Sequence, residues 1–292
     1  MSDSHAHSGS GKNIKTAFFL NFTFTIFEFV GGFYLNSLAI MADAVHDLGD
    51  TLSLGLSWFL NKSSQKEKTK TFSYGFKRLS VLSAFINCLV LITGSLFILS
   101  EAIPRLINPE HFNAKGMLIF ALFGIFFNGL AAYRLKKGTR IDEKVVSWHL
   151  FEDVLGWFAV LIVSIISLVK DIHFLDPLLS ILIALYVLFN VVKNLKQAVS
   201  IFLEGTPKAI NLPAVESEIC KIPRVKAVHD THLWTLDGEN HILTTHLILE
   251  KGTSNDEVVT IKCQVKKLLA KQKINHSTLE VEEEDEACAV ID

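Results

Sequence analysis

Long apolar stretches separated by short polar segments make up the first two thirds of the chain. Each stretch is about 20 residues long, which is the length of a helix that crosses a bilayer. The third is expected to end before Pro104 and the sixth to open at Asp176-Pro177, because proline is tolerated only in the first turn of a helix. The pattern predicts six transmembrane helices, at 14–35, 38–60, 78–103, 114–134, 145–169 and 177–202.

The pattern changes after LEGTP (203–207). Helical periodicity, strand-like alternation and a turn signal at Asp237-Gly238 then follow one another along the chain. Their order predicts a cytosolic α+β domain with the ferredoxin-like succession αββαβ, its helices on one face of the sheet. The predicted elements are a helix at 214–222, strands at 225–236 and 241–250, a helix at 256–272 and a strand at 277–284.

Composition agrees with a membrane domain joined to a soluble one. Half of the 292 residues are hydrophobic and the mean hydropathy is +0.36. We expect a flexible N-terminal tail at 1–12, a six-helix transmembrane domain at 13–207 and the cytosolic domain at 208–292. No cleaved signal peptide is expected. The formal net charge of −2 gives no electrostatic support for a nucleic-acid partner, and the four scattered cysteines argue against a disulfide framework.

Basic residues alternate from loop to loop. They gather before the first span, after the second and after the fourth, whereas the loops YLNS and DIHFLD contain no Lys or Arg. By the positive-inside rule, this multi-pass chain has both termini in the cytoplasm, and the cell membrane is the expected location. The basic residues are Lys12, Lys15, Lys62, Lys66, Lys68, Lys70, Lys77, Arg78, Arg134, Lys136, Lys137, Arg140 and Lys144.

Two H-x-x-x-D pairs lie inside the second and fifth spans. They are His46 with Asp50 and His149 with Asp153. Residues four apart share a helix face, and an ionisable group at membrane depth costs about 2.5–3.5 kcal/mol even on lenient scales. Two nitrogens and two oxygens that converge form a four-ligand site suited to zinc, which indicates metal ions moving through a membrane. The alternative is that these residues make polar contacts between helices.

The second span also contains Asp43 and Asp47, three residues before the members of the pair. Their spacing makes part of the same helix face acidic. Two interpretations stay open: the two acids form an access path for cations or support the metal ligands, or they make simple hydrogen bonds between helices.

An intramembrane zinc hydrolase is the rival from another functional class. Such an enzyme needs an open metal position for an activated water and a general base. Four protein ligands close the coordination shell, and no H-E-x-x-H motif is present. We therefore predict that the chain is not an enzyme.

Several motifs together carry a family resemblance that runs in order over nearly the whole chain. The chain resembles the cation diffusion facilitator family, and within it the zinc-transporting branch. The motifs are NFTFTIFEFVGGFYLNSLAIMADAVHDLGD (21–50), YGFKRLSVLSAF (74–85), EAIPRL (101–106), SWHLFEDVLGW (147–157), DPLLSILIA (176–184), LEGTP (203–207) and VHDTHLWTL (228–236).

The resemblance implies a homodimer in the lipid bilayer that exports Zn²⁺ in exchange for protons. It implies transport ligands at His46, Asp50, His149 and Asp153, and a cytosolic domain for dimerisation and regulatory Zn²⁺ binding through His229, His246 and Glu282. Transport of cadmium, cobalt or manganese is the first alternative, and a membrane zinc sensor without transport is the second.

Three departures from the family pattern concern metal sites other than the transport site, and they reduce the number of such sites that we expect. Phe76 and Ser80 replace metal ligands that family members often have after the second span. The loop KKGTRIDEK between spans four and five is short and lacks a His-rich segment. The helix at 256–272 lacks a histidine that some members use, so one cytosolic metal is expected rather than two.

The predicted hairpin contains four histidines. Alternation along a strand allows His229 and His246 to pair across strands, with His232 on the opposite face. His232 and His241 are expected to be surface residues. Metal binding by His5, His7 and Cys288 is left open. A last expectation concerns Lys77, which is either paired with Glu204 or a lysine of the positive-inside pattern.

Overall fold

The computed structural model describes the backbone of residues 7–64, 68–136, 141–170 and 172–284. Side chains are described for the same ranges except 7–17, 57–58, 60–64, 131–132, 134–136 and 141–150. His5, His7 and Cys288 therefore lie outside the described side chains, as do Lys66 and Lys137.

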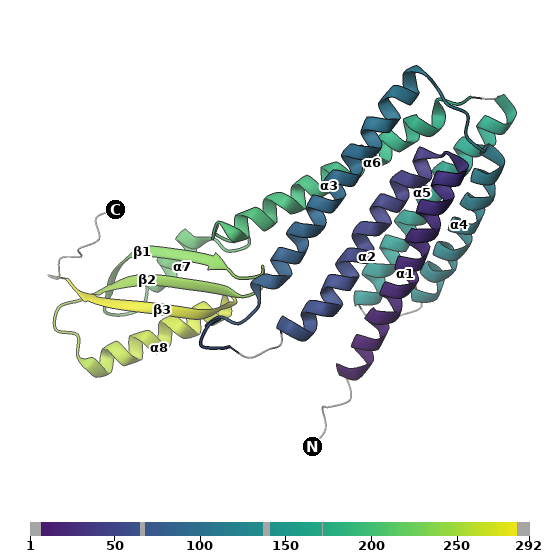
Figure 1. The fold of residues 1–292 in the computed structure, drawn as a ribbon. Helices are drawn as coiled ribbons and strands as arrows, with labels where there is room; N and C mark the ends of the chain where they lie inside the picture. Colours follow the sequence, from purple (N-terminus) through teal and green to yellow (C-terminus); the bar gives the residue numbers. More distant parts are fainter. Residues whose placement is uncertain (1–6, 65–67, 137–140, 171, 285–292) are drawn as a thin grey trace. The chain divides into compact units, whose positions relative to one another are not determined.

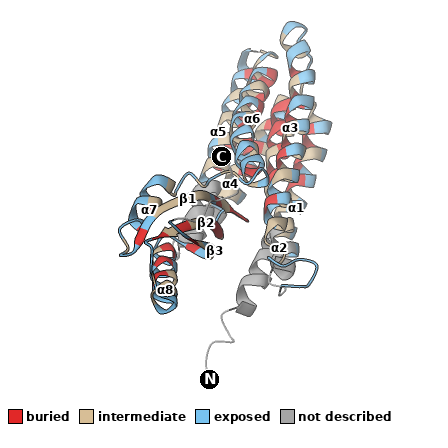
Figure 2. Ribbon diagram, turned by 90° about the vertical axis from the view of Figure 1, so that its left-hand side faces the viewer, coloured by how far each residue is buried: buried red, intermediate tan, exposed pale blue. Residues whose placement is uncertain are grey.

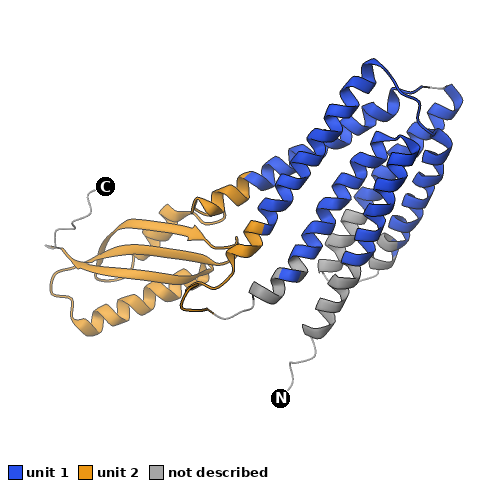
Figure 3. Ribbon diagram, in the orientation of Figure 1, with its two compact units in different colours: residues 1–63, 83–195 blue, residues 64–82, 196–292 orange. Residues whose placement is uncertain are grey.

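The chain divides into two compact units, coloured separately in Figure 3. The first contains residues 1–63 and 83–195, and the second contains residues 64–82 and 196–292.

Long helices build the first unit and follow the apolar stretches of the sequence (Figure 1). Four of them have described segments long and apolar enough to cross a membrane, and α4 has a shorter apolar segment, Ala114–Leu130. The helix α2 is less apolar because it contains Asp43, Asp47 and Asp50. The expected transmembrane helical domain is confirmed. Its helices are α1 (His7–Leu35), α2 (Leu38–Ser64), α3 (Arg78–Ile107), α4 (Ala114–Lys136), α5 (Ile141–Lys170) and α6 (Leu175–Phe202).

The expected end of the third helix before Pro104 is wrong. The helix α3 continues through Pro104 to Ile107, and the Asn108 N–H donates to the Pro104 carbonyl at 2.9 Å. Proline removes one N–H donor but keeps its own carbonyl, so the turn after it still closes. Arg105 in this last turn donates to Asn36 at 2.9 Å and forms an ion pair with Glu110 at 3.3 Å.

Buried residues, red in Figure 2, are distributed along these helices and form two clusters between them. One cluster joins α2, α3 and α6 through residues such as Val45, Ile98 and Val187. Another joins α2, α4 and α5 around Trp157, whose indole is fully buried. Packing on both sides therefore fixes the position of α2, the helix that carries His46.

The second unit contains the predicted cytosolic domain. Strand β1 pairs antiparallel with β2, and β2 pairs parallel with β3. Buried residues such as Leu243, Leu247 and Val265 form a core between the sheet and the helices, and Figure 1 shows both helices on one side of the sheet. The predicted αββαβ order is confirmed. The elements are α7 (Leu212–Ile219), β1 (Val225–Thr235), β2 (His241–Leu249), α8 (Asn255–Lys271) and β3 (Ile274–Glu283).

An irregularity in β1 corrects the expected orientation of His232. His229 pairs with His246 as expected, but His232 pairs with Thr244, so one extra residue is inserted between them. Such a bulge changes the alternation of faces along a strand. Since Thr244 and His246 lie on one face of β2, His232 shares the face of His229 rather than the opposite one.

The segment before α3 contacts the cytosolic domain within this unit. Arg78, not Lys77, forms the ion pair with Glu204, at 2.7 Å. Lys77 instead donates a hydrogen bond to the side chain of Asn240. Pairing with Glu204, one of the two alternatives left open for Lys77, is therefore wrong, and the neighbouring arginine makes that contact.

Candidate metal centres

The first H-x-x-x-D pair meets on α2 as its spacing predicts. His46 Nε2 lies 3.8 Å from Asp50 Oδ2, and both side chains are partly exposed. Their common face follows from the helical repeat. An imidazole and a carboxylate are thus available together on one side of the helix.

A cavity of about 240 Å³ lies between α2, α5 and α6. His46 and Asp153 line it from α2 and α5 respectively, together with Asp43, Glu152 and Gly156. The side chain of His149, also on α5, lies outside the part of the chain whose side chains are described. The structure therefore joins members of both pairs around one space.

Three acids are buried in or beside this cavity, and Asp43 is one of them. Glu28 of α1 is fully buried, and Asp43 and Asp47 of α2 are each 7% exposed. Among the described residues, neither carboxylate oxygen of Glu28 has a hydrogen-bond partner. The amide of Asn21 donates to the Asp47 carbonyl at 3.2 Å and to Thr51 Oγ1 at 2.9 Å, so polar groups do link α1 to α2. Buried carboxylates gathered in one place favour a cation, because an uncompensated buried charge is costly.

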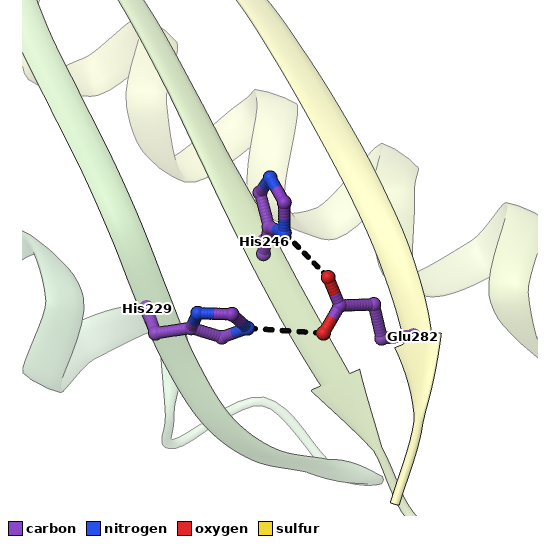
Figure 4. Close-up of side chains that lie close together, drawn as sticks. All are labelled: His229, His246 and Glu282. Atoms are coloured by element: carbon purple, nitrogen blue, oxygen red, sulfur yellow. Dashed lines mark hydrogen bonds and ion pairs between the residues drawn. The ribbon is translucent and has the colours of Figure 1, made fainter. Parts of the chain in front are cut away.

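Three side chains from the three strands converge in the cytosolic domain (Figure 4). His229 Nε2 lies 3.0 Å from Glu282 Oε2, and His246 Nδ1 contacts Glu282 Oε1. One potential ligand atom from each residue lies within 4.8 Å of the others. Two imidazoles and one carboxylate are donors that zinc accepts, which leaves a fourth position for water or another ligand.

Asp230 and Glu280 surround the same cluster and were not recognised from the sequence. Each places a carboxylate oxygen 3.5 Å from His246 Nε2. Asp230 also lies 2.9 Å from His232 Nε2 and has a positive φ of 48° in the bulge of β1. A carboxylate on the far nitrogen of a ligating histidine fixes its ring orientation. The alternation of side chains along the sequence gives no sign of the bulge that places Asp230.

The third histidine of the hairpin, His241, differs from expectation. His241 is 7% exposed rather than a surface residue, and burial lowers its pKa. His232 is exposed, as expected, with 66% of its side chain accessible.

Two family models match the chain in succession. The first, described as the cation efflux transmembrane domain, covers residues 14–203. The second, described as the cation efflux protein cytoplasmic domain, covers residues 207–284 and is a dimerisation domain by name. Together they account for both units of the fold.

Individual relatives are similar along almost their whole length. The zinc transporter ZitB of Pectobacterium atrosepticum is 32% identical over 96% of this chain and 88% of its own. The metal cation efflux system protein CzcD of Cupriavidus metallidurans is 31% identical over 96% and 89%. A cadmium, cobalt and zinc/H(+)-K(+) antiporter of Bacillus velezensis is 28% identical over 97% and 92%. The chain therefore belongs to the cation efflux, or cation diffusion facilitator, family: it is a multi-pass membrane transporter of divalent cations with a cytoplasmic C-terminal domain.

Proposed function

We propose that this protein exports Zn²⁺ in exchange for protons, with His46, Asp50, His149 and Asp153 as the ligands of the transported ion. The observation that carries the proposal is the cavity that His46 of α2 and Asp153 of α5 line together. Asp50 adds a carboxylate 3.8 Å from His46 on the same face. Relatives named as zinc transporters support zinc as the substrate.

The donor set favours zinc. Two imidazoles and two carboxylates suit Zn²⁺, which is of borderline softness and prefers tetrahedral coordination. Magnesium and manganese prefer six oxygen donors. Cadmium and cobalt accept the same donors, and relatives are named for these metals too. Selectivity among the three ions is therefore expected to be graded.

Coupling to protons follows from the same ligands. Imidazole and carboxylate lone pairs bind either a proton or a metal ion, so the two compete for the site. A metal that binds on the cytoplasmic side displaces protons, and protons on the other side displace the metal. Alternating access at one site is then sufficient for antiport, without a separate proton path.

We further propose that the cytosolic domain pairs with a second copy and binds a regulatory zinc ion at His229, His246 and Glu282. The contacts of both histidines with Glu282 bring all three strands to one point. An ion among these atoms replaces the proton that otherwise lies between imidazole and carboxylate. The loop charges support cytoplasmic termini. Placement in the cell membrane is part of the same proposal.

Zinc flux into proteoliposomes with an imposed pH gradient tests the transport proposal. We expect Asp153→Asn to abolish flux, because the change removes a charged ligand and preserves side-chain shape. Glu101→Gln on the exposed face of α3 is the matched control and should transport normally. Normal flux in Asp153→Asn would refute the ligand assignment, and no flux in the wild-type protein would favour a sensor instead.

A further inference from the structure

Two histidines from separate connections lie in contact at one end of the transmembrane helices. His111 belongs to the segment between α3 and α4, and His173 belongs to the segment between α5 and α6. Their ring centroids are 4.2 Å apart, with an angle of 74° between the ring planes. Neither residue is part of the proposed transport site or of the cytosolic site. The pair is therefore a separate group of two imidazoles.

Both histidines lie on the non-cytoplasmic side of the membrane. The helix α6 is long and apolar enough to span, and the cytoplasmic domain begins at residue 207, shortly after α6 ends at Phe202. The start of α6 at Leu175, next to His173, therefore faces away from the cytoplasm. An ion that this protein exports is released on the side where the two histidines lie.

Contacts with neighbouring segments hold the backbone of His111 in place. Asn36, in the turn between α1 and α2, donates to the His111 carbonyl at 3.0 Å and to Glu110 Oε2 at 3.2 Å. Glu110 also forms an ion pair with Arg105 at 3.3 Å, so its carboxylate already has a cationic partner and an amide donor. The exposed ring of His111 thus projects from a fixed backbone.

The segment of His173 is anchored as well. The Ser167 hydroxyl donates to the Ile172 carbonyl at 3.0 Å. The Phe112 ring meets the His173 ring edge-on, with centroids 5.8 Å apart. Ligands that are already held in place lose little freedom when an ion binds, and this raises the affinity of a small site.

The two rings are close to the separation that a shared metal ion requires. Zinc lies about 2.0 Å from each imidazole nitrogen, which places two ring centroids about 5 Å apart. In the proposed cytosolic site, the centroids of His229 and His246 are 5.0 Å apart. Both ring nitrogens of His173 are shielded from solvent, whereas His111 is exposed. An outward movement of the His111 ring by about 1 Å would therefore both open the site and set the spacing for an ion.

We propose that His111 and His173 bind a divalent metal ion on the non-cytoplasmic side, and that exported zinc which accumulates there occupies this site and slows transport. The inference rests on the proposed function and adds inhibition by the product to it. Imidazoles are good ligands for zinc, copper and nickel, and water completes the coordination shell.

The bound ion would join two connections that are separate in the sequence. It ties the α3–α4 segment to the α5–α6 segment, and the hydrogen bonds of Asn36 extend the link to the turn between α1 and α2. Alternating access requires the ends of helices to move relative to one another. An ion that holds these ends together therefore opposes the change of state.

Chemical modification tests binding without transport. Diethyl pyrocarbonate modifies exposed imidazoles, and mass spectrometry measures the modified fraction of each histidine in the full-length protein in detergent. We expect submillimolar Zn²⁺ to lower the modification of His111 severalfold in the wild-type protein. Zinc should have little effect in His173→Phe, which keeps an aromatic ring against His111 but removes the second ligand. His276, an exposed histidine that contacts Tyr74, is the internal control and should be modified equally with and without zinc.

Transport with metal on one side gives a second readout. Proteoliposomes in which the cytosolic domain faces outward are loaded with Ni²⁺, which then contacts only the non-cytoplasmic face, and the initial rate of zinc uptake is measured. Ni²⁺ should lower this rate severalfold in the wild-type protein and in the control His276→Phe. It should have little effect on the double variant His111→Phe/His173→Phe. Without Ni²⁺, all three proteins should transport zinc at similar rates.

Each readout has an outcome that overturns the inference. Zinc protection of His111 that is absent in the wild type, or that persists in His173→Phe, shows that the two histidines share no ion. Ni²⁺ that fails to inhibit the wild type, or that inhibits the double variant equally, shows that the pair does not regulate transport. If Asp153→Asn transports normally, the proposed function fails instead, whereas the protection of His111 still decides whether this site binds metal.

Discussion

At the scale of single residues, Asp176 determines how α2 begins although it lies far away in the sequence. Its carboxylate accepts the Leu38 N–H at 2.8 Å, the Ala39 N–H at 3.3 Å and the Ser37 hydroxyl at 2.6 Å. The first N–H groups of a helix have no partner within the helix, and a carboxylate there also complements the helix dipole. Asp176 thus anchors the helix that carries His46 and Asp50.

We expect Asp176→Ala to lower the free energy of unfolding by about 1–3 kcal/mol, because it leaves buried N–H groups without an acceptor. Asp176→Asn keeps one acceptor oxygen and should cost less. Thermal unfolding of the purified protein in detergent measures the difference. Equal midpoints for wild type and Asp176→Ala would show that water or another group replaces the cap.

At the scale of elements, local patterns predicted most of the fold. The described helices follow the apolar stretches closely, because hydrophobic length and the demands of the bilayer act within each segment. Features that depend on a partner element were not predictable. The bulge near His232 is visible only in the pairing of β1 with β2, and the choice of Arg78 over Lys77 by Glu204 depends on three-dimensional geometry.

In the candidate sites too, local spacing predicted some features, whereas others depend on how separate elements pack. The i, i+4 repeat was sufficient to place His46 beside Asp50, and strand alternation was sufficient to pair His229 with His246. Sequence spacing gave no sign that Glu152 would face the cavity, because its orientation depends on where α6 packs against α5. Roles for Asp43 were open until the cavity showed which side it faces.

The contact between α4 and α5 provides a prediction at this scale. A Cβ atom at Gly124 would lie 2.2 Å from Cδ2 of Trp157, a large side chain that is fully buried. We expect Gly124→Ala to destabilise the protein by about 1–3 kcal/mol through overpacking. Thermal unfolding in detergent and zinc flux would both report the change.

Gly129→Ala is the matched control on the same helix. The nearest atom to its Cβ would be Val154 Cγ2, at 4.0 Å, which is ordinary contact distance. Its effect should stay within about 0.5 kcal/mol of the wild type. Equal destabilisation by both substitutions would show that helix backbone effects, rather than the contact with Trp157, limit stability.

At the scale of the whole molecule, charge and metal binding act together on the cytosolic domain. Residues 208–292 contain ten Lys and Arg against fifteen Asp and Glu, a formal charge of −5. Two such domains repel each other when they pair. A zinc ion at His229, His246 and Glu282 would reduce that repulsion and join three strands, so metal supply inside the cell would influence pairing.

The domain has its own core, formed by residues from both of its helices and all three strands, so we expect residues 208–292 to fold without metal. Zinc at ten times its dissociation constant should then stabilise the domain by roughly 1.4 kcal/mol, which raises the melting temperature by about 5–10 °C. His246→Ala should abolish the rise in melting temperature because it removes a ligand from the central strand. His232→Ala changes an exposed position on the same sheet face and should retain the rise. In the full-length protein, His246→Ala should still transport zinc, because the membrane ligands remain. If zinc leaves the melting temperature of the wild-type domain unchanged, the domain has no regulatory zinc site, and only the membrane site binds the metal.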